Sequence, residues 1–309
     1  MHSEVVTVVM STYNGEAYLW EQIESIVSQE GVSLHLFIRD DGSSDGTLGI
    51  LREAVARYPE VVSYDLGENV GWKRSFLLAL AAAPRGDFYA FADQDDVWLS
   101  GKMLRAVEML DSRSCLEDDP KLYVSNSTVC DCFLNPIGFT HAVPLDPMEK
   151  SKGELFVENE QRGLTFVFNE KLRQLVLRVV DPGAKGHDWW TSVLARAFGS
   201  IVYDYESFVL YRQHDANAVG ATPGFLARLK NWIKIITSPG DLSSTCANTL
   251  LNVFGDELQD DEFEKFLKTV RASKKSIRNR VSLLGCSDFH RSCPSGTMIL
   301  RVRTLLGKY

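Results

Sequence analysis

The 309-residue chain is 45% hydrophobic and 24% charged, an ordinary globular composition that excludes a disordered, collagen-like or disulfide-dense protein. No apolar run reaches about 18 residues, so we expect no transmembrane helix. The acidic N-terminus leads directly into an apolar strand pattern, so we expect no signal peptide. Six cysteines without a C-x-x-C pair favour reduced thiols and a cytoplasmic protein.

The first ninety residues alternate between strand and helix patterns. Strands are predicted over 5–10, 34–38, 61–64 and 88–92, and helices over 16–29, 45–58 and 71–83. This alternation is typical of a Rossmann-like α/β fold, with a mostly parallel sheet flanked by helices. Ligands of such sheets bind beyond the carboxyl ends of the strands.

The rest of the chain is mixed at first and then helical. Strands are predicted over 122–129, 164–168 and 201–209, and helices over 171–180, 187–198, 225–236 and 260–284, followed by an apolar and basic stretch over 298–306. We therefore place a boundary near Gly220. It separates a catalytic domain over 1–220, whose two halves divide near residue 100, from a helical C-terminal region over 221–309.

Charge differs between these two regions. Residues 1–220 have 19 basic and 33 acidic residues, a net charge of −14, whereas residues 221–309 have 14 and 8, a net charge of +6. An acidic main body argues against nucleic acid as a partner. Its acids are instead candidates for holding a metal ion and a nucleotide.

The strongest chemical signal is the acidic cluster of Asp93, Asp95 and Asp96, directly after the fourth strand. Like charges this close repel one another, so they need either a cation or solvent. A solvated acidic turn is the structural alternative. Because the acids end a buried strand, we predict a site for a divalent cation and a nucleotide.

Asp40 and Asp41 close the second strand, where an acid commonly accepts a hydrogen bond from a nucleoside. Capping of the next helix is the alternative. Residues 11–15 lack the G-x-G-x-x-G pattern, which argues against a nicotinamide or flavin enzyme. Lys73 could contact a diphosphate or remain on a solvated helix face.

Several motifs together carry a family resemblance. They are VVMSTYN at 8–14, RDDGSSDGT at 39–47, NVG at 69–71, ADQDDVW at 92–98, HDWW at 187–190 and YRQH at 211–214. In this order they resemble family 2 glycosyltransferases with the GT-A fold, and the last two resemble its bacterial rhamnosyltransferase-like branch, which builds O-antigens and cell-wall polysaccharides. The resemblance covers about residues 5–220. The Q-x-x-R-W signature of processive members is absent, which favours transfer of a single sugar.

The resemblance implies a donor site. Nucleotide-sugar contacts are expected from Ser11, Thr12, Tyr13, Asn14, Asp41, Asn69, Lys73, Asp93, Gln94 and Asp96. Asp41 would accept the base N3–H, and Asp96 would face the donor sugar. Asp95, the last acid of the D-x-D motif, would bind Mg²⁺ or Mn²⁺ on the diphosphate, and His214 would complete the metal site. A hydrogen-bonded loop histidine is the alternative for His214.

The resemblance also implies an acceptor side. Asp188 matches the catalytic base, and a sugar hydroxyl needs such a carboxylate to take its proton. A helix-end acid favoured by the helix dipole is the alternative. Trp189 and Trp190 would stack on sugar rings or form core, and Gly163 would line the acceptor side or belong to a buried strand.

We therefore predict an inverting, metal-dependent glycosyltransferase. By resemblance, it moves L-rhamnose from dTDP-β-L-rhamnose onto a glycan, expected to be a lipid-linked oligosaccharide. A UDP-hexose or UDP-N-acetylhexosamine donor is the nearest alternative. A sugar nucleotidyltransferase would need a glycine-rich, basic loop at residues 11–15, and a non-catalytic binding module is disfavoured by Asp188 beside a complete D-x-D motif.

The C-terminal stretch over 263–309 has 11 basic and 2 acidic residues, with apolar residues at roughly helical spacing. One hypothesis is peripheral attachment to the inner face of the plasma membrane. The alternatives are a packed helical appendage and a homodimerisation element.

Overall fold

The computed structural model describes residues 4–112, 119–141, 146–183, 185–214 and 243–309. Chain contacts divide it into two units: unit 1 is Met1–Pro147, Gln161–Asp181 and Leu194–His214, and unit 2 is Met148–Glu160, Pro182–Val193 and Asp215–Tyr309. The predicted boundary near Gly220 and the predicted helix over 225–236 lie outside the described residues. The predicted domain division stays a prediction.

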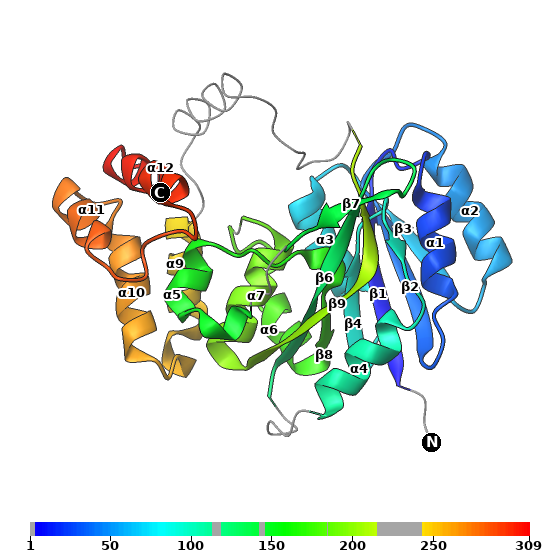
Figure 1. Cartoon of the computed structure of the whole chain (residues 1–309), viewed down its shortest axis with the longest axis horizontal. Helices are drawn as coiled ribbons and strands as arrows, with labels where there is room; N and C mark the ends of the chain where they lie inside the picture. Colours follow the sequence, from blue (N-terminus) through cyan, green and yellow to red (C-terminus); the bar gives the residue numbers. More distant parts are fainter. Residues whose placement is uncertain (1–3, 113–118, 142–145, 184, 215–242) are drawn as a thin grey trace. The chain divides into compact units, whose positions relative to one another are not determined.

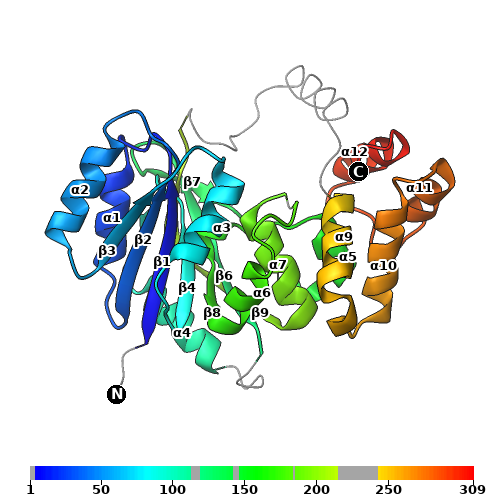
Figure 2. The same cartoon turned by 180° about the vertical axis from the view of Figure 1, so that it is seen from behind.

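Unit 1 is built on one mixed sheet (Figures 1 and 2). Its strands are β1 (Val5–Thr12), β2 (Ser33–Asp40), β3 (Val62–Leu66), β4 (Phe88–Ala92), β5 (Val97–Trp98), β6 (Lys121–Cys130), β7 (Pro136–Phe139), β8 (Val167–Asn169) and β9 (Ser200–Arg212). Among the described residues their order is β3-β2-β1-β4-β8-β6-β9-β5, and β7 pairs with β6. β1 to β4 are parallel, and β8 is antiparallel to β4 and β6. The predicted α/β fold is confirmed.

Helices cover both faces of this sheet. α1 (Leu19–Val27), α2 (Thr47–Arg57) and α4 (Lys102–Ser112) lie on one face, and α3 (Trp72–Ala82) and α6 (Glu170–Leu177) on the other (Figures 1 and 2). Val6 and Val8 of β1 share a core with Ile23 of α1, while Val9, on the opposite side of the strand, is equally buried. Two covered faces explain why β1 is a continuous apolar run.

Unit 2 is helical. It contains α5 (Lys152–Val157), the start of α7 (His187–Phe198), α9 (Ser243–Phe254), α10 (Asp261–Ala272), α11 (Ile277–Leu284) and α12 (Pro294–Leu305). Its core is aromatic: the Phe156 ring lies 5.0 Å from Trp189 and 6.0 Å from Phe266, both edge-on. The predicted helical character of the C-terminal region is confirmed for the described residues 243–309.

Two predicted elements differ from those observed. The helix predicted over 260–284 is two helices, because Ser276 caps α11: its Oγ accepts the Asn279 N–H at 3.2 Å. The strand predicted over 164–168 begins as a 3₁₀ turn, Gly163–Thr165, before β8. α4, α5, α9, β5 and β7 were not predicted.

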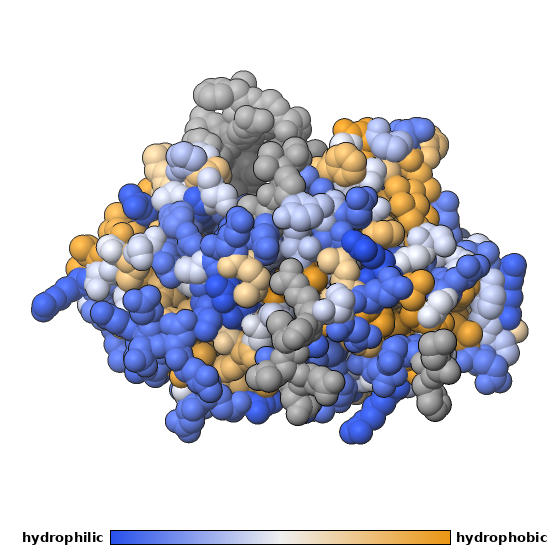
Figure 3. All heavy atoms as spheres, turned by 60° about the horizontal axis from the view of Figure 1, so that its bottom comes forward, coloured by the Kyte–Doolittle hydropathy of each residue, from blue (hydrophilic) through white to orange (hydrophobic). Residues whose placement is uncertain are grey.

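The described helices include none that is long and apolar enough to cross a bilayer. The face in Figure 3 is mostly hydrophilic, and its hydrophobic side chains lie in separate patches. The five cysteines in the described part of the chain are free.

Candidate functional site

The loops after β1, β2 and β4 are joined by side-chain hydrogen bonds. Thr12 Oγ1 and the Tyr13 N–H both donate to Gln94 Oε1, at 2.7 and 2.8 Å. Asn14 adopts a positive φ of 49°, and its Oδ1 accepts the Ser44 N–H at 2.9 Å. The predicted donor-site residues of these loops therefore lie together at the carboxyl edge of the sheet, and Tyr13 and Asn14 are exposed there.

Asp41 is buried and orders the loop after β3. Its Oδ1 lies 2.5 Å from Arg39 Nη1, and its carboxylate accepts the N–H groups of Val70 and Gly71 at 3.1 and 2.9 Å. Asn69, the next residue toward β3, is exposed. Asp41 thus fixes the backbone around Asn69, and its predicted contact with the base stays a prediction.

Ser11 and Lys73, two other residues predicted to contact the donor, differ in exposure. Ser11 is partly buried, and its Oγ donates to Ser75 Oγ at 2.6 Å. Lys73 is exposed on α3, with Nζ 5.5 Å from the centre of the Trp72 ring. Lys73 is therefore accessible to an anion, whereas Ser11 is tied to α3.

The three acids of the acidic cluster differ in burial. Asp93 and Asp95 are partly exposed, whereas Asp96 is fully buried and its Oδ1 accepts the Arg212 N–H at 3.1 Å. Burial first, and then the charges of Asp93 and Asp95, raise the pKa of Asp96 well above its usual value. The structure thus places Asp96 in the interior beneath the loop, and its predicted contact with the donor sugar stays untested.

Lys102 is a second buried ionisable group below this loop. Its Nζ lies 3.7 Å from the centre of the Trp98 ring and has no hydrogen-bond partner in the described part of the chain. Burial lowers the pKa of Lys102 to about 7, although the charge of Asp96 acts in the opposite direction. Buried Asp96 and Lys102 therefore each hold their charge less readily than an exposed counterpart.

Asp95 and His214 form the pair that the sequence predicts. Asp95 Oδ2 lies 2.9 Å from His214 Nε2, and the two side chains are 16% and 13% exposed. β5 follows Asp95 and pairs antiparallel with β9, which brings together residues 119 positions apart. Carboxylates are usual ligands of Mg²⁺ and Mn²⁺, and imidazole binds divalent transition metals, so the pair suits Mn²⁺ better than Mg²⁺.

Within the described ranges, no group of three His, Cys, Asp or Glu residues is arranged to hold a metal ion. A two-ligand set nevertheless fits a divalent cation whose shell is completed by water and substrate phosphates, as is common for Mg²⁺ at phosphate-binding sites. The Asp95–His214 pair therefore suits a cation that binds together with a diphosphate.

Arg212 is a site residue that sequence reasoning missed. Its Nε donates to the Asp95 carbonyl at 2.9 Å, its Nη1 donates to the Cys132 carbonyl at 2.7 Å, and its Nη2 pairs with Glu21. The guanidinium also lies over the Tyr18 ring, 4.6 Å from its centre. Arg212 stands within YRQH, but its hydrogen-bond partners are remote in the sequence and are brought to it only by the fold.

The predicted acceptor-side residues fall in different places. Asp188 is partly exposed in the first turn of α7, where its Oδ1 accepts the Trp189 N–H at 2.7 Å. Trp189 is 4% exposed, and its Nε1 donates to the Phe156 carbonyl at 3.0 Å. Trp190 is fully buried, 6.2 Å from the Phe254 ring. Gly163 is buried in unit 1, in the 3₁₀ turn before β8.

A mixed sheet whose parallel strands end in joined polar loops, with an Asp–His pair beside them, is typical of nucleotide-binding α/β proteins. Solved glycosyltransferases share the fold: residues 1–349 of TarS from S. aureus, in complex with UDP-GlcNAc, match with a TM-score of 0.54 at 14% identity, over 99% of this chain and 89% of that one. GalNAc-T7, solved with UDP, GalNAc and Mn²⁺, matches with a TM-score of 0.58 at 14% identity, over 90% and 53%. The fold is that of GT-A glycosyltransferases.

The sequence model of "Glycosyl transferase family 2" matches residues 7–116. The dTDP-rhamnosyl transferase RfbG of Shigella flexneri is 30% identical over 232 residues, which are 72% of this chain and 77% of that relative. The putative teichuronic acid biosynthesis glycosyltransferase TuaG of Bacillus subtilis is 28% identical over 173 residues, 55% and 68% of the two chains. The chain therefore belongs to the family 2 glycosyltransferases and is a transferase.

We expect Arg212→Ala to lower the free energy of unfolding by at least about 2 kcal/mol, because it removes several buried hydrogen bonds to a charged group. Arg57→Ala is the matched control: Arg57 also pairs with a glutamate of α1, Glu24, but its side chain is 55% exposed against 4% for Arg212. That loss should stay within about 1 kcal/mol. Urea unfolding of both variants measures this, and equal losses would contradict the assigned role of Arg212.

Proposed function

We propose that the protein is an inverting, metal-dependent rhamnosyltransferase that moves L-rhamnose from dTDP-β-L-rhamnose onto a glycan acceptor. The observation that carries the donor assignment is the 30% identity to RfbG over 77% of that relative. A UDP-hexose or UDP-N-acetylhexosamine donor would use the same fold and is the alternative. The acceptor is proposed to be a lipid-linked oligosaccharide of bacterial surface polysaccharide synthesis.

At the donor end, Asp95 and His214 would hold Mg²⁺ or Mn²⁺, the cation that we propose for this site. When bound, the cation neutralises the charge that develops on the leaving diphosphate. Other residues of the chain hold Asp95 and the neighbouring loops in position. Arg212 holds the Asp95 backbone, and the hydrogen bonds among Thr12, Tyr13 and Gln94 fix the loops beside it. Loops that are already ordered lose less freedom when the donor binds.

At the acceptor end, we propose Asp188 as the general base. In the described part of the chain its carboxylate accepts one hydrogen bond, from the Trp189 N–H to Oδ1, which leaves Oδ2 for an acceptor hydroxyl. Asp188 takes the hydroxyl proton while the oxygen attacks the anomeric carbon, on the side opposite the nucleotide. One displacement inverts the β-linked donor to an α-L-rhamnoside, and its transition state has oxocarbenium character.

We expect Asp188→Asn to cut turnover by roughly 10² or more, the scale of a lost general base, while leaving nucleotide binding intact. The amide keeps the shape of the side chain but cannot take the proton.

Asp95→Ala is the complementary variant, and it should remove the gain in dTDP affinity that Mn²⁺ gives. The measurements are sugar-transfer rates and calorimetric dTDP titrations with and without Mn²⁺.

Turnover of Asp188→Asn within a few-fold of the parent would reduce Asp188 to a helix-end acid. An unchanged Mn²⁺ effect in Asp95→Ala would remove Asp95 from the metal site. The two failures are independent, because one variant is read by rate and the other by binding.

We further propose that α11 contacts the inner face of the plasma membrane. Ile277 and Val281, one turn apart, are 67% and 57% exposed, and Arg278 beside them is exposed as well. Apolar side chains next to basic ones are typical of helices that lie in an anionic interface. Not all of the basic residues are involved, because Arg280 and Lys274 donate to the carbonyls of Leu305 and Gly307.

The test is flotation of the full chain on neutral and anionic vesicles. We expect Ile277→Ser/Val281→Ser to reduce flotation on anionic vesicles severalfold, and Val253→Ser, a 40% exposed valine of α9, to have no effect. Equal flotation of all three proteins would contradict membrane contact. So would a dimer in solution that only the double variant dissociates, since it would show that α11 covers a second copy.

A further inference from the structure

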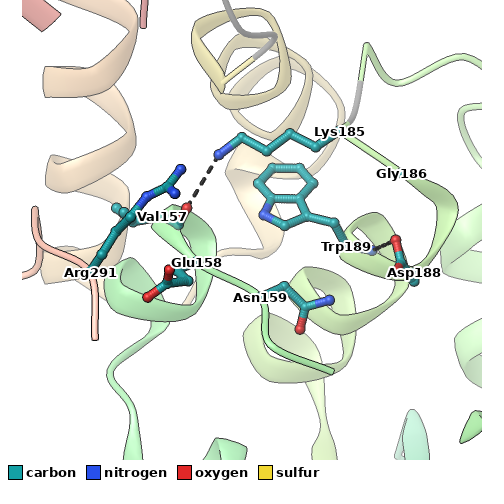
Figure 4. A pocket seen from close by; sticks show the side chains of 8 residues that line it. All are labelled: Val157, Glu158, Asn159, Lys185, Gly186, Asp188, Trp189 and Arg291. Carbon is teal, nitrogen blue, oxygen red and sulfur yellow. Dashed lines mark hydrogen bonds between the residues drawn. The ribbon is translucent and has the colours of Figure 1, made fainter. Parts of the chain in front are cut away.

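Unit 2 contains a pocket of about 270 Å³ that includes the proposed base (Figure 4). Its lining includes Val157, Glu158, Lys185, Asp188, Trp189 and Arg291. Its volume is just below the range of about 300–1,000 Å³ that is usual for ligand pockets, so it suits one sugar ring or one diphosphate. Two of its lining residues are cations, and neither belongs to a motif of the family resemblance.

Arg291 is the first of these cations. Its guanidinium makes no hydrogen bond or ion pair within the described ranges, and its Nε is buried. Its backbone is held, because its N–H donates to Thr297 Oγ1 at 2.9 Å and its carbonyl accepts from the same hydroxyl at 3.1 Å. A partly buried guanidinium without a partner is costly, and its planar fork matches the oxygens of a phosphate or carboxylate.

Lys185 is the second cation of the pocket, and its ammonium is held by a hydrogen bond. Nζ donates to the Val157 carbonyl at 3.2 Å and lies 5.4 Å from the centre of the Trp189 ring (Figure 4). The bond and the ring together keep a positive charge at the pocket wall.

The acidic groups at the pocket are Glu158 and Asp188. Glu158 is already engaged, because its Oε2 accepts the Ser292 N–H at 2.7 Å. Asp188 is the proposed base, with Oδ1 on the Trp189 N–H. Arg291 is therefore the charged group of this pocket that has no partner among the described residues, and an oxyanion would complement it.

We propose that this pocket binds an anionic group of the acceptor, with Arg291 and Lys185 as its cations. The anion is a phosphate or diphosphate, or a sugar carboxylate, because these groups present the same oxygens to a guanidinium. Binding there holds the acceptor in the pocket that contains Asp188. The inference rests on the proposed function, and it names the class of acceptor for the same site.

The test uses inorganic pyrophosphate as the probe, titrated calorimetrically into the full chain in EDTA. EDTA removes divalent cations, so metal-dependent binding at the donor end does not contribute. We expect Arg291→Gln to weaken pyrophosphate binding about tenfold or more, the scale of a lost hydrogen bond to a charged group. Arg52→Gln, an equal charge change at an exposed position of α2, should leave binding unchanged.

Two further measurements keep the test decisive. Arg291→Lys retains the positive charge but lacks the planar guanidinium, so it should bind pyrophosphate with intermediate affinity. Thermal melting shows whether each variant folds. Glucuronate and geranyl diphosphate, each titrated into the parent and Arg291→Gln, distinguish a carboxylate from a lipid diphosphate as the natural anion. Arg291-dependent binding of either one supports the proposal.

The proposal is overturned if none of the three probes shows saturable binding, or if Arg291→Gln binds the probes no more weakly than Arg52→Gln. Either result would leave the rhamnosyltransferase assignment standing, because that assignment is read from sugar transfer. Conversely, Asp188→Asn should still bind pyrophosphate. Evidence against Asp188 as the general base would therefore not count against the anion site.

Discussion

The donor end depends on one buried guanidinium. Arg212 donates to the backbone of the acidic loop at Asp95 and to the end of β6 at Cys132, and it pairs with Glu21 of α1. Three segments that are far apart in the sequence thus meet at a single side chain. Because the arginine fork is planar and its donors are fixed in direction, it sets the relative position of the segments more narrowly than a lysine could.

The functional groups follow from that constraint. His214 lies two residues beyond Arg212, so fixing the arginine also fixes the histidine against Asp95 at 2.9 Å. Asp96 accepts the Arg212 N–H and is buried, which separates it from its two more exposed neighbours. The acidic cluster is therefore not three equivalent ligands. One acid faces the histidine, and another supports the strand that carries it.

The sequence was most informative where local pattern decides structure. The apolar run of β1 predicts a strand covered on both faces. The family resemblance of D-x-D and YRQH, rather than any local pattern, implied that Asp95 and His214 serve one metal site. The short strand β5 could not be predicted, because two residues, Val97–Trp98, have no periodicity and are defined by their pairing with β9. The role of Arg212 was missed for the same reason, since its partners lie 80 to 191 positions away.

The acceptor side shows a different limit. HDWW predicts a helix with an acid in its first turn, and the structure agrees, but the pattern does not distinguish a tryptophan that lines a pocket from one in the core. Trp189 lines the pocket and Trp190 is buried against Phe254. Arg291 belongs to no motif and comes to Asp188 only through the packing of unit 2, so its unpaired guanidinium is visible in the structure alone.

The identity of the donor is tested most directly by a thermal-shift titration with Mn²⁺ and matched concentrations of dTDP-β-L-rhamnose, UDP-glucose and UDP-N-acetylglucosamine. A ligand that binds only the folded protein raises the melting temperature by mass action, and the rise grows with concentration over Kd. We predict a saturating rise with dTDP-β-L-rhamnose that is larger than with either UDP-sugar. A larger rise with a UDP-sugar would contradict the rhamnosyltransferase assignment.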